Sequence, residues 1–157
     1  MTPRPQDVAW RMFIETSARL QTVLEEELKR DASITLSDYN ILLLLVEAPD
    51  RRMRMRDLAA RMIFSSSRLS YQIDTMARRG WIDRQRAIED RRGSYAVLTP
   101  EGYDAFTSAA RGHGACIEEL FGSLITDDEA ASLIATLSTL RDHLEHADEH
   151  HQRRVRQ

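Results

Sequence analysis

The fold is decided by residues 55–100, which read MRDLAARMIFSSSRLSYQIDTMARRGWIDRQRAIEDRRGSYAVLTP. Apolar residues recur at helical spacing over 53–62 and again over 65–79, which predicts two short helices joined by a tight turn. The period then changes to the alternation typical of strands over 81–86 and 94–98, with polar and charged residues between them. Two short helices followed directly by a β-hairpin are typical of a winged helix-turn-helix.

Residues with special backbone preferences mark where these elements begin and end. The serines at 65–67 are N-cap candidates for the second helix, because a short side-chain oxygen accepts from the free N–H groups of a helix start. Gly80 lies where a left-handed residue ends a helix. Thr99 and Pro100 predict a new helix, with threonine as its N-cap and proline at its first position.

Longer helices are predicted on both sides of this unit. Residues 8–30 carry apolar side chains at helical spacing, and Ser37 is the expected N-cap of the helix that follows. A further helix is predicted over 100–121. Thr126 and Glu129 form a capping box that opens the last helix.

The predicted fold is therefore mainly α, with about six helices and a β-hairpin wing. The winged helix-turn-helix lobe is expected over 35–99, and a helical dimerisation region over 1–34 and 100–157. Each flanking helix carries an apolar stripe, and a small winged module cannot bury all of them. The apolar stripes are most simply buried against a second copy of the chain, so we expect a homodimer.

Charge separates the middle of the chain from its ends. Residues 51–92 hold 12 arginines and five acidic residues, whereas the whole chain has a net charge of −3. A basic block in an acidic protein indicates a polyanionic partner such as duplex DNA. Charge alone equally fits a solvated surface, so this interpretation depends on the predicted helix-turn-helix.

The helix at 65–79 is the candidate recognition helix. Its serines allow close approach to a groove floor, Arg68 has the geometry to bind guanine, and Gln72 to bind adenine. An arginine at the hairpin tip suits a narrow minor groove, with Asp90 as its support, although Asp90 and Arg92 equally fit a structural clamp. The predicted DNA-binding residues are Ser65, Ser66, Ser67, Arg68, Ser70, Tyr71, Gln72, Arg86, Asp90, Arg91 and Arg92.

Five short motifs carry a family resemblance, namely MRDLAARM at 55–62, SSSRLS at 65–70, MARRGWI at 76–82, EDRRG at 89–93 and VLTPEG at 97–102. Together they resemble the MarR (multiple antibiotic resistance regulator) family. The resemblance implies an obligate homodimer on a pseudo-palindromic operator, with recognition helices in successive major grooves and wings in the minor grooves. It implies that Arg92 or Arg91 enters the minor groove, and that a small molecule commonly controls DNA affinity.

The resemblance also places an effector site where the dimer helices meet the DNA-binding lobe. The candidate lining residues are Trp10, Phe13, Tyr39, Leu43 and His113. Aromatic residues at helical spacing are more often core than pocket, so both interpretations remain open.

The remaining reactive side chains favour a structural interpretation. A single cysteine, Cys116, excludes an internal disulfide and is expected to be a buried, inert thiol. His143, His146 and His150 share a helix face, but no convincing further ligand accompanies them, and we predict no metal.

Several functional classes are not expected. No apolar run is long enough for a membrane span, and no signal peptide opens the chain, so a cytoplasmic location is predicted. The sequence contains no phosphate-cradling glycine loop, no well-spaced metal motif and no activated nucleophile, so neither an enzyme nor a cofactor is expected. The predicted function is a DNA-binding repressor relieved by a small hydrophobic or aromatic ligand. The alternatives are a DNA-binding regulator without an effector and a winged-helix protein-interaction module.

Overall fold

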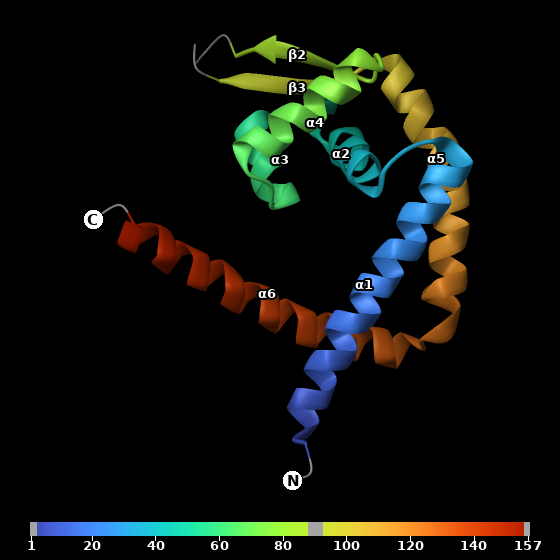
Figure 1. Ribbon diagram of the computed structural model, residues 1–157, viewed down its shortest axis with the longest axis vertical. Helices are drawn as coiled ribbons and strands as arrows, with labels where there is room; N and C mark the ends of the chain where they lie inside the picture. The colour runs from blue at the N-terminus through green and yellow to red at the C-terminus, as the bar shows by residue number, and fades with distance from the viewer. Residues whose placement is uncertain (1–2, 88–92, 156–157) are drawn as a thin grey trace. The chain divides into compact units, whose positions relative to one another are not determined.

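The computed structural model describes residues 3–87 and 93–155 of the 157-residue chain, with side chains described up to residue 147 (Figure 1). Its elements are α1 (Pro5–Ala32), α2 (Leu36–Glu47), the 3-10 turn η1 (Pro49–Arg51), β1 (Arg52–Arg54), α3 (Met55–Met62), α4 (Ser66–Arg78), β2 (Ile82–Arg86), β3 (Ser94–Leu98), α5 (Pro100–Leu120), the 3-10 turn η2 (Gly122–Leu124) and α6 (Asp127–Val155). The chain divides into two compact units, Met1–Ile117 and Glu118–Gln157. The sequence predicts a different division, with a winged lobe over 35–99 and a dimerisation region over 1–34 and 100–157. That functional division stays a prediction.

A small antiparallel sheet lies beside the helix-turn-helix. Its strand order is β1-β3-β2, and the β2–β3 hairpin agrees with the predicted one. Strand β1 was not predicted, because 53–62 was interpreted as helix throughout. Arg54 of β1 lies opposite Tyr95 of β3, so the first residues of this stretch are extended and the helix begins at Met55. The mainly α winged helix-turn-helix fold is confirmed.

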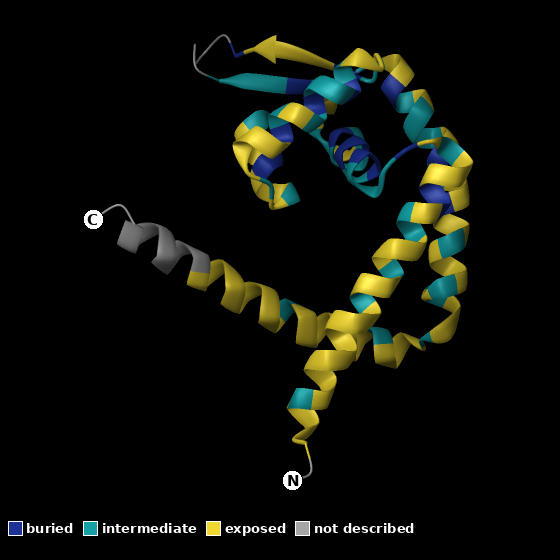
Figure 2. Ribbon diagram, viewed as in Figure 1, coloured by how far each residue is buried: buried dark blue, intermediate teal, exposed yellow. Residues whose placement is uncertain are grey.

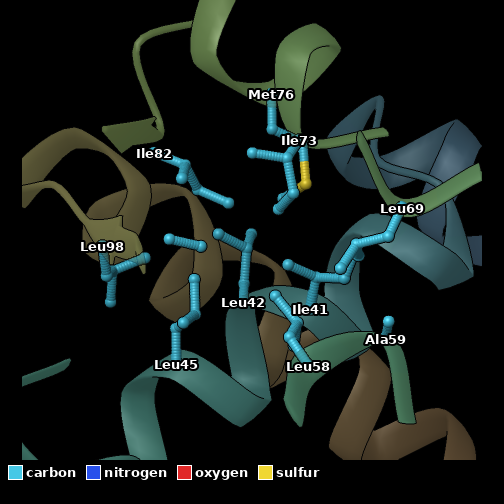
Figure 3. Close-up of a cluster of buried hydrophobic side chains, with 11 residues drawn as sticks. Ile41, Leu42, Leu45, Leu58, Ala59, Leu69, Ile73, Met76, Ile82 and Leu98 are labelled. Atoms are coloured by element: carbon cyan, nitrogen blue, oxygen red, sulfur yellow. The ribbon is translucent and has the colours of Figure 1, made fainter. Parts of the chain in front are cut away.

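The core of the lobe lies where α2, α3, α4 and the sheet meet (Figure 3). Leu69, Ile73 and Met76 form one face of α4 and are buried, as their spacing predicts. They pack with Ile41, Leu42 and Leu45 of α2, with Leu58 and Ala59 of α3, and with Ile82, Ala96 and Leu98 of the hairpin. Burial of each large aliphatic side chain contributes roughly 1.5–3 kcal/mol, so this cluster holds α4 on the lobe.

The start of α2 is set by Thr35, not by Ser37 as expected. The Thr35 hydroxyl accepts from the Asp38 backbone N–H at 3.0 Å, and the Asp38 carboxylate accepts from the Thr35 N–H at 3.2 Å. This reciprocal capping box places Ser37 inside the first helical turn. The prediction was wrong by two residues because Thr35 and Ser37 are both good N-caps, and only Thr35 has an acidic partner three residues later.

The start of α5 agrees with the prediction and explains the motif around Thr99. The Thr99 hydroxyl donates to the Gly80 carbonyl oxygen at 2.7 Å and accepts from the Gly102 N–H at 3.0 Å. Gly80 has a φ of +76°, which glycine adopts without steric cost. A Cβ on Gly102 would collide with the Trp81 carbonyl oxygen, so this position requires glycine. The hairpin and α5 are thereby joined at one backbone crossing.

The second compact unit consists mainly of α6, and its capping box is also confirmed. Glu129 accepts from the Thr126 N–H at 2.8 Å, and Thr126 accepts from the Glu129 N–H at 3.3 Å. Figure 2 shows α6 as largely exposed along its described length. The large apolar residues among its described side chains recur at a spacing close to 3.5 and are exposed, namely Leu133, Ile134, Leu137, Leu140 and Leu144.

Candidate nucleic-acid interface

The first turn of α4 presents short polar side chains to solvent. Ser65 is the N-cap, and its hydroxyl accepts from the Arg68 backbone N–H at 3.3 Å. Ser66, Ser67 and Arg68 are exposed, and Tyr71 on the next turn is 71% exposed. The predicted recognition face is therefore accessible, while the opposite face of α4 is in the core.

Arg68 is supported by an aromatic ring. Its guanidinium carbon lies 3.8 Å from the centroid of the Phe64 ring, which is within the range of a cation–π interaction. Phe64 is half-buried and precedes the N-cap of the helix. The stacking restricts the arginine stem but leaves its N–H donors available, which suits a side chain that binds a base edge or a phosphate.

Gln72 lies apart from these exposed residues. Its side-chain amide donates to Asp38 of α2, which is only 4% exposed. The expected contact with adenine would require Gln72 to leave this buried carboxylate. The structure instead gives Gln72 an internal partner, which joins the recognition helix to the capping box of α2.

Ser70 is engaged with the hairpin rather than free. Arg84 of β2 donates from one terminal nitrogen to Ser70 at 3.1 Å and to Asp74 at 2.9 Å. These two bonds connect the hairpin to α4, and Figure 1 shows the two elements side by side. Arg86 is exposed at the end of β2. The predicted tip residues Asp90, Arg91 and Arg92 lie outside the described residues.

The structure adds candidate cations that sequence reasoning missed. The Nε of Arg54 donates to the Tyr95 hydroxyl at 3.1 Å, and Arg52 lies over the same ring at 5.1 Å. Arg51 lies over the ring of Tyr103 at 4.1 Å. The alternation of arginine and methionine from Arg52 to Arg54 is compatible with a strand that has both cations on one face. It was overlooked because three residues are too few to stand out beside a helix.

The five candidate effector residues do not form one site within the chain. Tyr39 and His113 are 8% and 3% exposed, and their ring centroids lie 4.3 Å apart. Trp10 and Phe13 are 61% and 41% exposed on the first half of α1. Seventeen residues of α1, or about 25 Å, separate Trp10 from Glu27, the helix's contact with His113.

The buried members of this set belong to a packed polar cluster. The Nδ1 of His113 lies 3.3 Å from a carboxylate oxygen of Glu27, and the Tyr39 ring stacks on Phe106 at 5.3 Å. Burial raises the pKa of Tyr39, and the charge of Glu27 raises it further. Leu43, partly buried, packs against the same cluster. These contacts are those of a core that joins α1, α2 and α5.

The other candidate reactive groups give no metal site in the part that the structure describes. Cys116 is partly buried on α5, so it is less enclosed than the buried thiol that the sequence predicts. Among the described side chains, no three histidine, cysteine or acidic groups gather in a metal-binding arrangement. His143 and His146 lie on exposed turns of α6, and the side chain of His150 is outside the described residues.

Fold and surface together define a winged helix-turn-helix protein whose candidate recognition helix, α4, has an exposed first turn. A family model described as MarR family matches residues 32–93. The structure of AbsC, a MarR family transcriptional regulator from Streptomyces coelicolor, is 34% identical with a TM-score of 0.87, and the match covers 92% of this chain and 97% of that one. Sco3205 from the same organism, solved in complex with DNA, is 30% identical with a TM-score of 0.87, covering 92% and 91%. The chain belongs to the MarR family of transcriptional regulators.

Curated relatives agree with this assignment over a shorter span. The transcriptional repressor YetL of Bacillus subtilis is 28% identical over 106 residues, 68% of this chain and 63% of that protein. The regulator YkoM of the same organism is 28% identical over 93 residues, 59% of this chain and 60% of that protein. The chain thus spans about three fifths of the curated relatives it matches. These proteins are described as regulators, not as enzymes. In the described part of the chain, no helix combines the length and hydropathy of a membrane span.

Proposed function

We propose that this chain is a cytoplasmic, homodimeric repressor that binds a pseudo-palindromic site in double-stranded DNA. The observation that carries the proposal is the exposed start of α4, where Ser66, Ser67 and Arg68 face solvent beside the hairpin. A helix with this face enters the major groove and presents its first residues to base edges. The similarity to Sco3205, which was solved in complex with DNA, supports the same use of the surface.

The exposed apolar side chains support the dimer. The first half of α1 exposes Val8, Trp10, Met12, Phe13 and Ile14, and α6 exposes a second apolar stripe. Patches of this kind on a water-soluble chain mark interaction surfaces. In a twofold dimer, two recognition helices about 34 Å apart reach successive major grooves on one face of the duplex. The pairing of two chains therefore sets the geometry of the DNA site.

The test compares two exposed arginines on the same helix. Arg68→Ala removes the predicted base contact at the start of α4, and Arg78→Ala removes an arginine from its last turn. We expect Arg68→Ala to lower affinity for sites selected from a random duplex library by 10- to 100-fold and to relax base preference, because a bidentate contact contributes about 1–3 kcal/mol. Arg78→Ala is expected to bind like the parent.

The alternatives give different results in the same experiment. Parent protein that binds no duplex even at low salt would support the protein-interaction module and overturn the proposed function. Equal affinity of the Arg68→Ala variant and the parent for all sequences would remove Arg68 from the site. Binding by both variants with unchanged base preference would also contradict the assignment of α4 as the reading element.

We further propose that a small aromatic or hydrophobic ligand relieves repression by moving α4 relative to α1. Two hydrogen bonds join α4 to the end of α1 and the start of α2, namely Gln72 to Asp38, and Arg79 to the Ser33 carbonyl at 3.0 Å. A hollow of about 950 Å³ lies between α1, α2 and the start of α4, and both Phe64 and Arg68 line it. A ligand there would contact the recognition helix directly.

This second proposal is tested by filling the hollow. Ala18 of α1 lines it, so Ala18→Phe occupies space that a ligand needs, whereas Ala60→Phe adds the same ring to an exposed position of α3 outside the lining. A thermal-shift screen with substituted benzoates and phenols should find ligands that stabilise the parent and Ala60→Phe but not Ala18→Phe. No stabilising ligand, or equal stabilisation of all three proteins, would favour the regulator without an effector in this hollow.

A further inference from the structure

A single buried carboxylate joins the recognition helix to α2. Asp38 is 4% exposed, and its two carboxylate oxygens accept hydrogen bonds from different elements. One oxygen accepts from the Thr35 backbone N–H at 3.2 Å, and the other accepts from the side-chain amide of Gln72. Burying a carboxylate is costly unless hydrogen-bond donors replace the water it loses. The bond from Gln72 therefore stabilises Asp38 in the lobe as well as holding α4.

A second hydrogen bond holds the end of the same helix. Arg79, the C-cap of α4, donates to the Ser33 carbonyl oxygen at 3.0 Å, and its guanidinium carbon lies 3.6 Å from the centre of the Trp81 ring. Gln72 and Arg79 are about two helical turns apart, so they lie on the same side of α4. Hydrogen bonds are directional, and two of them on one side of a helix fix its rotation as well as its position.

Both bonds end on the connection between α1 and α2, residues 33–38, which is itself fixed to α1. Ser33 is the left-handed C-cap of α1, and its N–H donates to carbonyl oxygens of the last turn of that helix. The Leu36 N–H donates to the carboxylate of Glu25 on α1. Apolar packing on the other face of α4 is not directional. The polar bonds therefore set the rotation of α4 relative to α1 and α2.

We propose that Asp38 and Gln72 are positioning residues for DNA binding and that Gln72 reads no base, which rests on the proposed function of the chain. The amide that an adenine contact needs is already bound to a carboxylate buried in the lobe. This bond orients the exposed first turn of α4 before DNA binds, so less ordering is required on binding. Losing the bond weakens binding to every sequence alike.

The first measurement separates positioning from base reading. The full-length parent and Gln72→Ala each select sites from a random duplex library, and affinities for selected and unselected duplexes are compared. We expect Gln72→Ala to bind every sequence about two- to tenfold more weakly, as for the loss of one hydrogen bond, with unchanged base preference at each position. A residue that reads adenine would instead lose that preference at one position of the site.

Thr35→Ala is the matched control for lost stability. It removes the hydroxyl that accepts from the Asp38 N–H at 3.0 Å and so weakens the cap of α2, but it leaves both donors to the Asp38 carboxylate in place. We expect a lower melting temperature and, well below that temperature, the DNA affinity of the parent. If Thr35→Ala weakens DNA binding as much as Gln72→Ala does, general destabilisation explains both effects and the proposal is wrong.

The second measurement reverses the direction of the bond. Gln72→Glu sets two carboxylates against each other, and DNA affinity should fall at least about tenfold. Adding Asp38→Asn restores the net charge, because the asparagine amide donates to the new glutamate while its oxygen accepts from the Thr35 N–H. We expect this double variant to recover most of the lost affinity. Gln72→Glu with Glu47→Gln, at an exposed position of α2, has the same net charge but no new donor and should stay weak.

The outcomes separate this inference from the proposed function. Parent protein that binds no duplex overturns the function itself. Where the parent binds, a base preference lost only in Gln72→Ala assigns Gln72 to base reading, and parent-like affinity of Gln72→Ala removes the positioning role. Equal affinities of the two double variants show that net charge rather than the bond controls binding. Each of these last three results overturns the inference and leaves the function standing.

Discussion

The winged lobe and the ends of the chain use apolar side chains in opposite ways. In the lobe, α2 and α4 bury theirs against the sheet, and Leu42, Leu45 and Ile73 are fully inaccessible. The first half of α1 and the whole described length of α6 leave theirs in solvent (Figure 2). The lobe therefore buries its apolar side chains within one chain, whereas the terminal helices expose theirs, as the proposed dimer requires. Substitutions can test whether the two regions respond as differently as this comparison predicts.

The largest expected effect lies in the core of the lobe. Leu42→Ala removes a fully buried side chain of α2 and leaves a cavity between α4 and the sheet. The free energy of unfolding should fall by about 2–5 kcal/mol. Chemical denaturation monitored by circular dichroism measures the change. Leu124→Ala, at a position 72% exposed, is the control and should alter stability by no more than about 0.5 kcal/mol.

A second substitution tests the crossing that joins the hairpin to α5. Gly102→Ala places a methyl group against the Trp81 carbonyl oxygen, and the strain should cost about 1–3 kcal/mol of unfolding free energy. Gly114→Ala, on the same helix, meets no atom within 4 Å and should instead stabilise the chain by up to about 1 kcal/mol. The same sign of change for both variants would show that the crossing is looser than described.

Association, rather than folding, should respond to changes in the terminal helices. Leu137→Glu introduces a charge into the apolar stripe of α6, and the dissociation constant of the dimer should rise at least about tenfold, or 1.4 kcal/mol. Sedimentation equilibrium over a range of protein concentrations measures it. Thr136→Glu adds the same charge at the preceding exposed position and should associate like the parent. If neither variant changes the oligomeric state, the stripe is not the dimer contact.

A stabilising change is available at the turn between α3 and α4. Ile63 has a φ of 54° and is 91% exposed, so a β-branched residue sits in a left-handed conformation without any packing to favour it. Ile63→Asn should raise the unfolding free energy by about 1 kcal/mol, because asparagine tolerates this conformation better. Ile63→Val keeps the branching and should leave the melting temperature near that of the parent. Equal melting temperatures for Ile63→Asn and the parent would argue against strain at this turn.

The smallest expected effect concerns pH and the α1–α2 junction. Burial opposes the ionisation of Glu25, but the hydrogen bonds from Lys29 and the Leu36 N–H outweigh it, so the pKa of Glu25 lies below its ordinary value of 4.5. The ionised form is therefore favoured in the folded state, which adds stability above that value and loses it as the pH falls. Glu25→Gln should reduce the acid sensitivity of the midpoint of denaturation between pH 6 and pH 3. Glu26→Gln controls for the loss of one charge from α1.

Local chemistry made much of the architecture predictable. The buried face of α4 follows from the spacing of Leu69 and Ile73, and its N-cap follows from Ser65 just before its first residue. The hairpin follows from the change of period, and the start of α5 from Thr99 and Pro100. Signals of this kind involve residues within one turn of each other, so the backbone conformation they favour does not depend on distant parts of the chain.

The candidate site was only partly predictable. The exposure of Arg68 follows from its place on α4, but its support by Phe64 depends on how the turn folds. The engagement of Gln72 by Asp38 joins residues 34 positions apart, and the bond between Arg84 and Asp74 requires the hairpin to return to α4. A polar residue on a helix face can point to solvent or to a neighbour, and periodicity does not distinguish the two.

By itself, the sequence determined the order of the six helices and the hairpin, the N-caps at Ser65, Thr99 and Thr126, and the basic character of the central region, because these depend on neighbouring residues. Only the tertiary structure decided that Arg52–Arg54 is a strand, since its partners on β3 lie 41 positions later for Arg54 and Tyr95. It also brought arginines from β1, α3 and β2 around one hollow beside α4. The pairing of strands and the gathering of charged side chains from separate elements both depend on contacts between distant segments. Local conformational preferences do not encode such contacts.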